Sequence, residues 1–211
     1  MSEGMPEETL RPGSKIGLLG GSFNPAHEGH RHISLMCLEA LGLDCVWWMV
    51  SPGNPLKPQE GMAPFDERLN SAREMARDPR IVVSDIEARL GTRYTADTLA
   101  ALTKRHPEVH FIWLMGADNM LQLPQWRNWR AIAEMVPIAV YPRPGYTEKA
   151  LNSPAATELA QAILNPDEAK RLPLAAPPAL IFLSGPENPL SATEIRERSG
   201  WGTTPKQDDA G

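Results

Sequence analysis

Apolar residues along the chain follow two alternating patterns. Short continuous apolar runs, bounded by glycine, proline or serine, predict buried strands at residues 15–21, 45–50, 80–84, 109–115, 137–141 and 180–184. Segments with apolar residues three and four apart predict helices at residues 29–42, 65–77, 95–105, 128–135 and 154–164. Apolar strands that alternate with amphipathic helices are typical of a parallel sheet covered on both faces. We therefore predict a doubly wound, Rossmann-like α/β fold.

The predicted elements belong to one domain over residues 15–200. A chain of 211 residues suffices for one ordinary domain, which needs no metal or disulfide to fold. We expect residues 1–14 and 201–211 to be flexible flanks. Residues 142–179 are rich in proline and alanine and poor in strand patterns, so we expect an insertion packed beside the sheet.

Composition excludes several classes of protein. A net charge of −5 argues against a dedicated nucleic-acid binder, which normally has a basic face. No apolar run reaches the roughly 20 residues that span a bilayer, and the first residues lack the apolar segment of a signal peptide. Cys37 and Cys45 have no zinc-ligand spacing, and we interpret them as buried thiols. We expect a cytoplasmic protein with no membrane partner.

The most informative segment follows the first predicted strand and is Gly20-Gly21-Ser22-Phe23-Asn24-Pro25-Ala26-His27-Glu28-Gly29-His30. Glycines at such a turn let the backbone approach a phosphate, and the next helix offers unpaired N–H groups. The segment is neither the G-x-G-x-x-G dinucleotide motif nor a P-loop. Because ligands of open α/β sheets bind beyond the carboxyl ends of the strands, we expect the site here.

His27 and His30 give this segment its specificity. Residues three apart at a helix start share one face, so both imidazoles can donate to phosphate oxygens. When charged, they would also stabilise a departing pyrophosphate. The alternative interpretations are that both are surface or capping residues, or that they bind zinc. The spacing lacks the H-E-x-x-H arrangement, which argues against zinc.

The run resembles the signature of the nucleotidyltransferases that carry a (T/H)-x-G-H motif. More narrowly, it is similar to bacterial nicotinate-nucleotide adenylyltransferase. A second segment, residues 190–196, is similar to the signature I-S-[AS]-T-x-I-R of that superfamily, although Ala192 stands where many members have serine. There Ser191 and Thr193 can cap a helix and donate hydroxyls, and Arg196 offers a planar fork to phosphate.

Four further segments support the same resemblance, and each follows a predicted strand. Lys57 lies after the second strand, where the family has a basic residue. Residues 92–99 are similar to the family's S-Y-T-x-D-T-L, with Tyr94 as an aromatic wall and with Thr95 and Asp97 as expected helix caps. Residues 116–129 match G-[AQ]-D-[NS]…W. Residues 142–146 are similar to R-P-G-Y, which is also the pattern of a simple rigid turn.

The resemblance implies transfer of the adenylyl group of ATP to nicotinate mononucleotide, in NAD biosynthesis. It implies the catalytic residues His27, His30, Lys57 and Arg196. It implies that ATP contacts Gly20, Gly21, Ser22, Phe23, Gly29, Gly116, Asp118, Ser191 and Thr193. For nicotinate mononucleotide it implies contacts with Asn24, Tyr94, Thr95, Asp97, Trp126 and Arg143. We expect Mg²⁺ carried by the ATP phosphates, with no protein-built metal site, and a monomer or homodimer.

Other interpretations remain open at this point. Another acceptor is possible within the same superfamily: phosphopantetheine, nicotinamide mononucleotide or a compound like phosphocholine. From a different class, a regulator could bind nucleotides without catalysis, or a redox protein could bind finished NAD. The missing G-x-G-x-x-G motif argues against the redox protein, and the histidine pair argues against the regulator.

Overall fold

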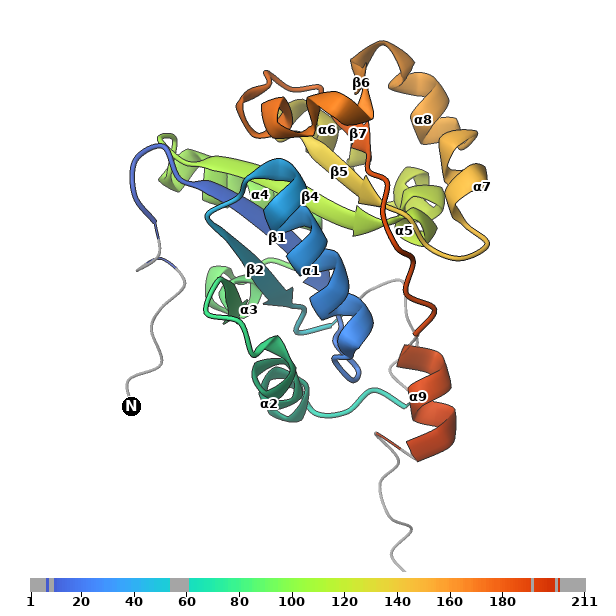
Figure 1. The fold of residues 1–211 in the computed structure, drawn as a ribbon. Coiled ribbons are helices and arrows are strands. Elements are labelled where there is room, and N and C mark those ends of the chain that lie inside the picture. Colours follow the sequence, from blue (N-terminus) through green and yellow to red (C-terminus); the bar gives the residue numbers. More distant parts are fainter. Residues whose placement is uncertain (1–6, 8–9, 54–60, 191, 200, 202–211) are drawn as a thin grey trace, which may run out of the picture.

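The computed structural model describes residues 7, 10–53, 61–190, 192–199 and 201. Within these residues, seven parallel strands form one sheet in the order β3-β2-β1-β4-β5-β7-β6 (Figure 1). The strands are β1 (Lys15–Gly21), β2 (Cys45–Val50), β3 (Ile81–Ser84), β4 (His110–Gly116), β5 (Ile138–Tyr141), β6 (Ile163–Leu164) and β7 (Leu180–Phe182). The predicted fold class is confirmed.

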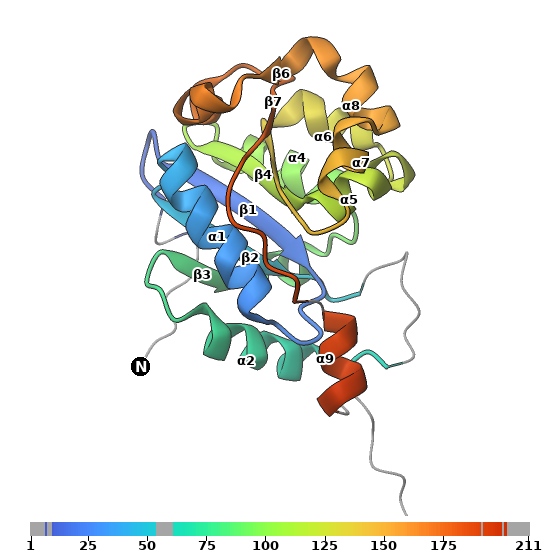
Figure 2. The same ribbon diagram turned by 45° about the vertical axis from the view of Figure 1, so that its right-hand side comes forward.

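Helices cover both faces of the sheet (Figure 2). One face carries α1 (Glu28–Leu41), α2 (Phe65–Ala76) and the 3-10 helix η4 (Pro166–Leu174). The other face carries α3 (Ile86–Leu90), α4 (Thr95–Arg105), α5 (Ala117–Gln122), α6 (Trp129–Met135), α7 (Thr147–Leu151), α8 (Pro154–Glu158) and the 3-10 helix η2 (Leu123–Gln125). The 3-10 helix η3 (Ala160–Ala162) follows α8, and α9 (Ala192–Ser199) lies beyond β7.

Strand β2 shows why its sequence is apolar at every position. Successive side chains of a strand point to opposite faces of the sheet, and both faces here are covered. Trp47 packs among the helices of one face with Leu99 of α4, whereas Trp48 packs on the other with Leu38 of α1. Both tryptophans are fully buried. The continuous apolar run is therefore the pattern of a strand with two cores.

The central position of β1 creates the crevice in which a ligand can bind. The chain builds β2 and β3 on one side of β1 and then crosses to place β4 on the other. The loops that follow β1 and β4 therefore leave the sheet in opposite directions and open a gap between them. The place where the strand order reverses is the topological switch point of the sheet, and the gap lies there, at the carboxyl ends of the strands.

One predicted element needs correction. The helix expected over residues 154–164 ends at Glu158, and after η3 the chain forms β6, which pairs in parallel with β7 at the edge of the sheet. A strand of two residues is too short to show a period in the sequence. Residues 142–179 thus contribute a strand to the sheet rather than only packing beside it. The other predicted boundaries agree within one or two residues.

The predicted flexible flanks lie mostly outside the described residues, so that expectation stays a prediction. Among the helices of the described part of the chain, none is long and apolar enough to cross a membrane.

Candidate active site

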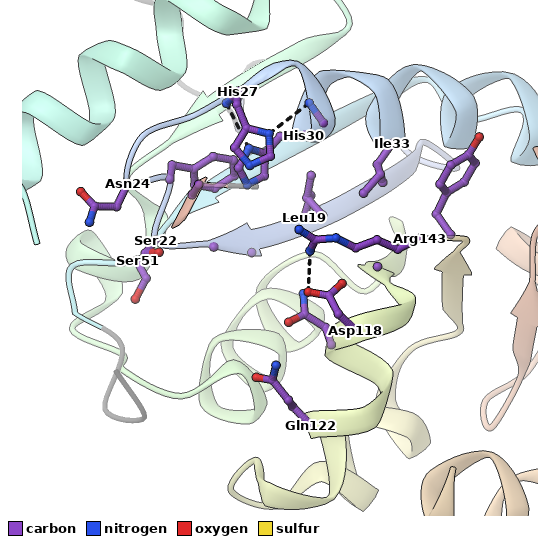
Figure 3. A pocket seen from close by; sticks show the side chains of 18 of the residues that line it. Leu19, Ser22, Asn24, His27, His30, Ile33, Ser51, Asp118, Gln122 and Arg143 are labelled. Atoms are coloured by element: carbon purple, nitrogen blue, oxygen red, sulfur yellow. Dashed lines mark hydrogen bonds and ion pairs between the residues drawn. The ribbon is translucent and has the colours of Figure 1, made fainter. Parts of the chain in front are cut away.

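A cavity of about 860 Å³ opens at the switch point (Figure 3). Its walls come from the loops after β1, β2, β4 and β5, from the start of α4 and from α9. Most of the predicted site residues line it: Gly20, Gly21, Ser22, Phe23, Asn24, His27, Gly29, His30, Tyr94, Thr95, Gly116, Asp118, Trp126, Arg143, Thr193 and Arg196. Segments far apart in the sequence therefore meet at one site.

Three predicted site residues are not among those that line the cavity. Lys57 and Ser191 lie outside the described residues. Asp97 is exposed on α4 and is absent from the cavity wall. The expected caps also need correction, because Tyr94 is the N-cap of α4 and makes no side-chain cap hydrogen bond. Thr95 is the first residue inside that helix and lines the cavity.

The two histidines cap the N-terminus of α1 reciprocally. The backbone N–H of Gly29 donates to Nδ1 of His27 at 3.1 Å, and the backbone N–H of His27 donates to Nδ1 of His30 at 3.2 Å. Because each Nδ1 is an acceptor, the neutral rings carry their protons on Nε2. A side chain at Gly29 would bring a Cβ to 2.8 Å from the His27 ring. Capping thus fixes the tautomer in which each ring is a donor through Nε2.

His27 is neutral in this arrangement. Burial lowers its pKa from 6.5 to about 4, and the positive charge of Arg143 adds to the effect. The additional role expected of charged rings would require a proton on His27 that this lowered pKa disfavours. A neutral imidazole with its proton on Nε2 still donates a hydrogen bond to an anionic oxygen.

Phe23 supports the histidines from behind. Its ring stacks on Trp48 with 5.1 Å between centroids and contacts the His30 ring at 4.7 Å. The side chain is 1% exposed, and its backbone has a φ of 46°, which is uncommon for a residue with a side chain. The turn after β1 therefore drives this ring into the core beneath His30, which limits its contact with a ligand.

Asn24 connects three separate segments. Its Oδ1 accepts from the backbone N–H of Ala63 at 3.1 Å and from Nε1 of Trp201 at 3.0 Å. Its Nδ2 donates to the carbonyl of Gly61 at 2.9 Å. The backbone carbonyl of Asn24 accepts from Arg196 Nη1 at 2.8 Å. The Asn24 amide is thus engaged with the protein, which makes it a support of the loop.

The opposite wall is built around Asp118, in the first turn of α5 just after β4. Arg143 Nη1 donates to its Oδ2 at 2.5 Å, and the pair is marked in Figure 3. Its Oδ1 is buried and has no hydrogen-bond partner within the described residues. A Cβ at Gly116 would lie 2.6 Å from this oxygen, so glycine is required beside it. A carboxylate held in this way can accept hydrogen bonds from the hydroxyl groups of a sugar.

The segment after β7 runs beside α1 and completes the cavity (Figures 1 and 2). The His32 ring lies 2.6 Å from the carbonyl of Pro186 through Nε2, and Tyr141 donates to the same carbonyl at 3.0 Å. These contacts hold the chain that leads into α9, where Arg196 donates to Thr193 Oγ1 at 3.1 Å.

Comparison with known proteins identifies the family. A family model described as cytidylyltransferase-like matches residues 18–198. A protein of Parvibaculum lavamentivorans named probable nicotinate-nucleotide adenylyltransferase is 68% identical over 194 residues, which cover 92% of this chain and 96% of that protein. The chain belongs to the nicotinate-nucleotide adenylyltransferase family.

A second relative agrees with this assignment to the nicotinate-nucleotide adenylyltransferases, and a solved structure agrees with the fold. One of the same name from Cereibacter sphaeroides is 53% identical, with 88% of this chain and 98% of that protein covered. A Plasmodium falciparum nicotinic acid mononucleotide adenylyltransferase, solved in complex with NaAD, has a TM-score of 0.66 at 16% identity and covers 87% of this chain and 83% of its own. At that identity it supports the fold alone. The resemblance stated from the sequence is confirmed.

The cavity is also lined by residues to which no role was assigned from the sequence, chiefly Ser51, Glu87, Arg93 and Arg127. Glu87 is 6% exposed. Burial raises its pKa to about 7, while hydrogen bonds from Ser51 and Thr98 partly offset the rise. A glutamate in a short polar helix ordinarily lies in solvent, so no sequence signal marked this one as buried.

No group of three or more His, Cys, Asp or Glu side chains that could hold a metal occurs within the described residues. Cys37 and Cys45 are both buried and form no disulfide bond, and burial raises the pKa of Cys37 to about 12.

The low pKa of His27 predicts a pH dependence of folding stability. The unfolded chain binds a proton near pH 6.5 and the folded protein only near pH 4, so stability falls as the pH drops through this window. The comparison is with a His27→Asn variant, whose side chain can still cap the helix. Between pH 7 and pH 4, the free energy of unfolding of the natural protein should fall by up to roughly 3 kcal/mol more than that of the variant. Urea denaturation at both pH values measures this difference. Because Glu87 titrates in both proteins, its contribution cancels, and equal losses would contradict the buried neutral histidine.

Proposed function

We propose that this chain transfers the adenylyl group of ATP to nicotinate mononucleotide and releases pyrophosphate and deamido-NAD. The observation that carries the proposal is the reciprocal cap of His27 and His30 at the N-terminus of α1. It aligns two ring donors with the positive end of the helix dipole, on the wall of a cavity of ligand-binding size. Such an array favours a group that becomes more anionic during the reaction.

The reaction needs no covalent enzyme intermediate. An oxygen of the mononucleotide phosphate attacks the α-phosphorus of ATP in line. The bond from that phosphorus to the bridging oxygen breaks, and its electron pair leaves with pyrophosphate. Donors from His27 and His30, together with Lys57 and Arg196, are proposed to hold the triphosphate. Catalysis is then mainly positioning and charge stabilisation.

The two substrates are proposed to occupy opposite ends of the cavity. The glycine-rich turn, α1 and the start of α9 would bind ATP, with Asp118 accepting a ribose hydroxyl. Tyr94, Thr95 and Trp126 would form the mononucleotide end. Trp126 is held edge-on against Trp113 with centroids 6.0 Å apart, which leaves an indole face for stacking on a pyridine ring. Asp97 remains the weakest member of the proposed set, because it is exposed away from this wall.

We propose that Mg²⁺ enters as part of the ATP substrate. Magnesium prefers phosphate and water oxygens to a cage made only of protein ligands, and it usually binds through one or two carboxylates at most. We also propose a cytoplasmic location, which is consistent with two buried cysteines that form no disulfide bond. The oligomeric state is proposed to be monomer or homodimer.

The decisive assay follows pyrophosphate release from MgATP with nicotinate mononucleotide, nicotinamide mononucleotide or phosphopantetheine as acceptor. We expect the highest kcat/KM with nicotinate mononucleotide. A preference for another acceptor would keep the chemistry and replace the substrate. Tight binding of ATP without release for any acceptor would instead indicate a regulator.

Replacement of His30 tests the catalytic array directly. Removing a preorganised donor to a developing anion typically costs about 10²–10³ in turnover. We expect His30→Ala to lower kcat by that factor, measured by the same pyrophosphate assay. His110→Ala is the matched control, because His110 is exposed and does not line the cavity. A loss below about threefold in His30→Ala would rule out the catalytic role.

Charge at the mononucleotide end supports the acid over the amide. Arg93 and Arg127 both line the cavity, and neither forms an ion pair with any residue that the structure describes. Arg127 follows Trp126 in the chain, and its guanidinium lies 4.6 Å from the centroid of the Tyr94 ring. A carboxylate on the pyridine ring would supply the missing negative charge, whereas a carboxamide would not.

Arg127→Met should therefore reduce the preference for nicotinate over nicotinamide mononucleotide. Because Arg127 is exposed to solvent, we expect a modest change of about tenfold in the ratio of the two kcat/KM values. Arg130→Met serves as the control, since Arg130 also stacks on an aromatic ring, at 4.7 Å from Trp129, but lies outside the cavity. An unchanged ratio in Arg127→Met would assign the selection of the acid to other groups.

A further inference from the structure

Arg68, in α2, is a buried cation that the proposed reaction does not use. The residue is 2% exposed, and within the described part of the chain its guanidinium donates to backbone carbonyls alone. Nη1 donates to Ser22 at 2.7 Å and to Ser51 at 2.8 Å, and Nε donates to Ala63 at 3.0 Å. A longer contact of 3.4 Å joins Nη2 to Pro52. One side chain thereby ties together the loop after β1, the loop after β2 and the start of α2.

No carboxylate pairs with this guanidinium among the described residues. The Phe65 ring, 5.4 Å away, is its aromatic neighbour. Burial of a charge without a counterion is costly, and burial lowers the pKa of Arg68 accordingly. Arginine nevertheless stays protonated in proteins, so the positive charge is retained. The carbonyls that Arg68 satisfies explain why a donor stands here, but a neutral donor would avoid the cost of the charge, which points to a use for the charge.

The location of the charge indicates that use. Ser22 and Ser51 both line the cavity, and the two loops are joined by a hydrogen bond of 2.9 Å from the Ser51 backbone N–H to the Gly21 carbonyl. Figure 3 shows both serines on the same side of the cavity as Asn24. Arg68 therefore lies directly behind the glycine-rich turn. In a weakly polarisable interior, a charge in this place acts on an anion across the loop.

Glu87, an acidic group linked to this network through Ser51, does not fully neutralise it. Glu87 is hydrogen-bonded to Ser51, whose carbonyl accepts from Arg68. Because the pKa of Glu87 is about 7, a large share of this carboxyl is protonated at neutral pH. Glu87 therefore offsets only part of the Arg68 charge before any substrate binds.

We propose that Arg68 is a positioning residue for phosphate binding: it holds the two loops at the phosphate end, and substrate phosphate supplies its missing counterion. The inference rests on the proposed function in that ATP is the phosphate donor. In this proposal Arg68 does not contact the substrate, and its charge acts on the phosphate through the carbonyls of Ser22 and Ser51. Removal of the charge should weaken pyrophosphate and ATP binding more than it lowers kcat.

The test compares Arg68→Gln, which loses the charge, with Arg68→Lys, which keeps a cation but loses the fork. Arg73→Gln, on the exposed side of the same helix, is the control. The probe is inorganic pyrophosphate with Mg²⁺, titrated by calorimetry, alongside KM for ATP and kcat. We expect the dissociation constant of pyrophosphate to rise about tenfold in Arg68→Gln and less than threefold in Arg68→Lys at pH 6.

A pH series separates charge from structure. A buried lysine loses its proton at lower pH than an exposed one, so Arg68→Lys should bind pyrophosphate progressively worse, relative to the natural protein, as the pH rises from 6 to 9. Taking the ratio at each pH cancels the ionisation of pyrophosphate itself. Glu87 titrates in the same range, while His27 stays neutral there, so the series is repeated in a Glu87→Gln background.

The outcomes are distinct. A graded loss in Arg68→Lys with rising pH supports the proposal even if Arg68→Gln fails to fold. Equal and pH-independent losses in both variants, or unchanged affinity in Arg68→Gln, would overturn it and leave Arg68 as a loop clamp only. If the natural protein binds pyrophosphate but turns over no acceptor, the proposed reaction fails while the effect of Arg68 on binding is still measured.

Discussion

The parallel pairing of β1 with β2 on one side and β4 on the other is the constraint on which the site depends. This register aligns Gly21 with Val50, and it places the end of β4 beside the end of β1. Side chains that lie far apart in the sequence then meet at one edge of the sheet. The apolar faces of β2 and β4 make the pairing stable, because each strand is buried on both sides.

The loops at that edge are held by polar groups rather than by apolar packing. Three such groups, His27, Asn24 and Arg68, are all buried, and each forms hydrogen bonds with the backbone of its own or a neighbouring loop. A buried polar group is destabilising unless such bonds are made, so removal of any one would leave unsatisfied partners. This explains how a glycine-rich turn, which has high intrinsic freedom, is held in one conformation. Preorganisation of this kind is what a reaction based on positioning requires.

The distribution of charge reconciles an acidic protein with anionic substrates. The chain has a net charge of −5, yet the cavity gathers Arg93, Arg127, Arg143 and Arg196, with Arg68 behind its wall. Of these, Arg143 is paired with Asp118. Net charge therefore describes the outer surface of the molecule and says little about a local pocket.

The sequence by itself determined the fold class and the family, and most of the site residues predicted from it do line the cavity. Those features depend on local patterns: apolar runs of strand length, helical spacing, and a glycine-rich turn with two histidines that is specific to one superfamily. Only the tertiary structure decided what each residue does there. It showed that Asn24 and Phe23 support the loop, that His27 is neutral, and that Ile163–Leu164 is a strand. It also showed Glu87 and Arg68 to be buried. The physical reason is that pKa, burial and hydrogen-bond partners are set by neighbours from distant segments, which no local pattern contains.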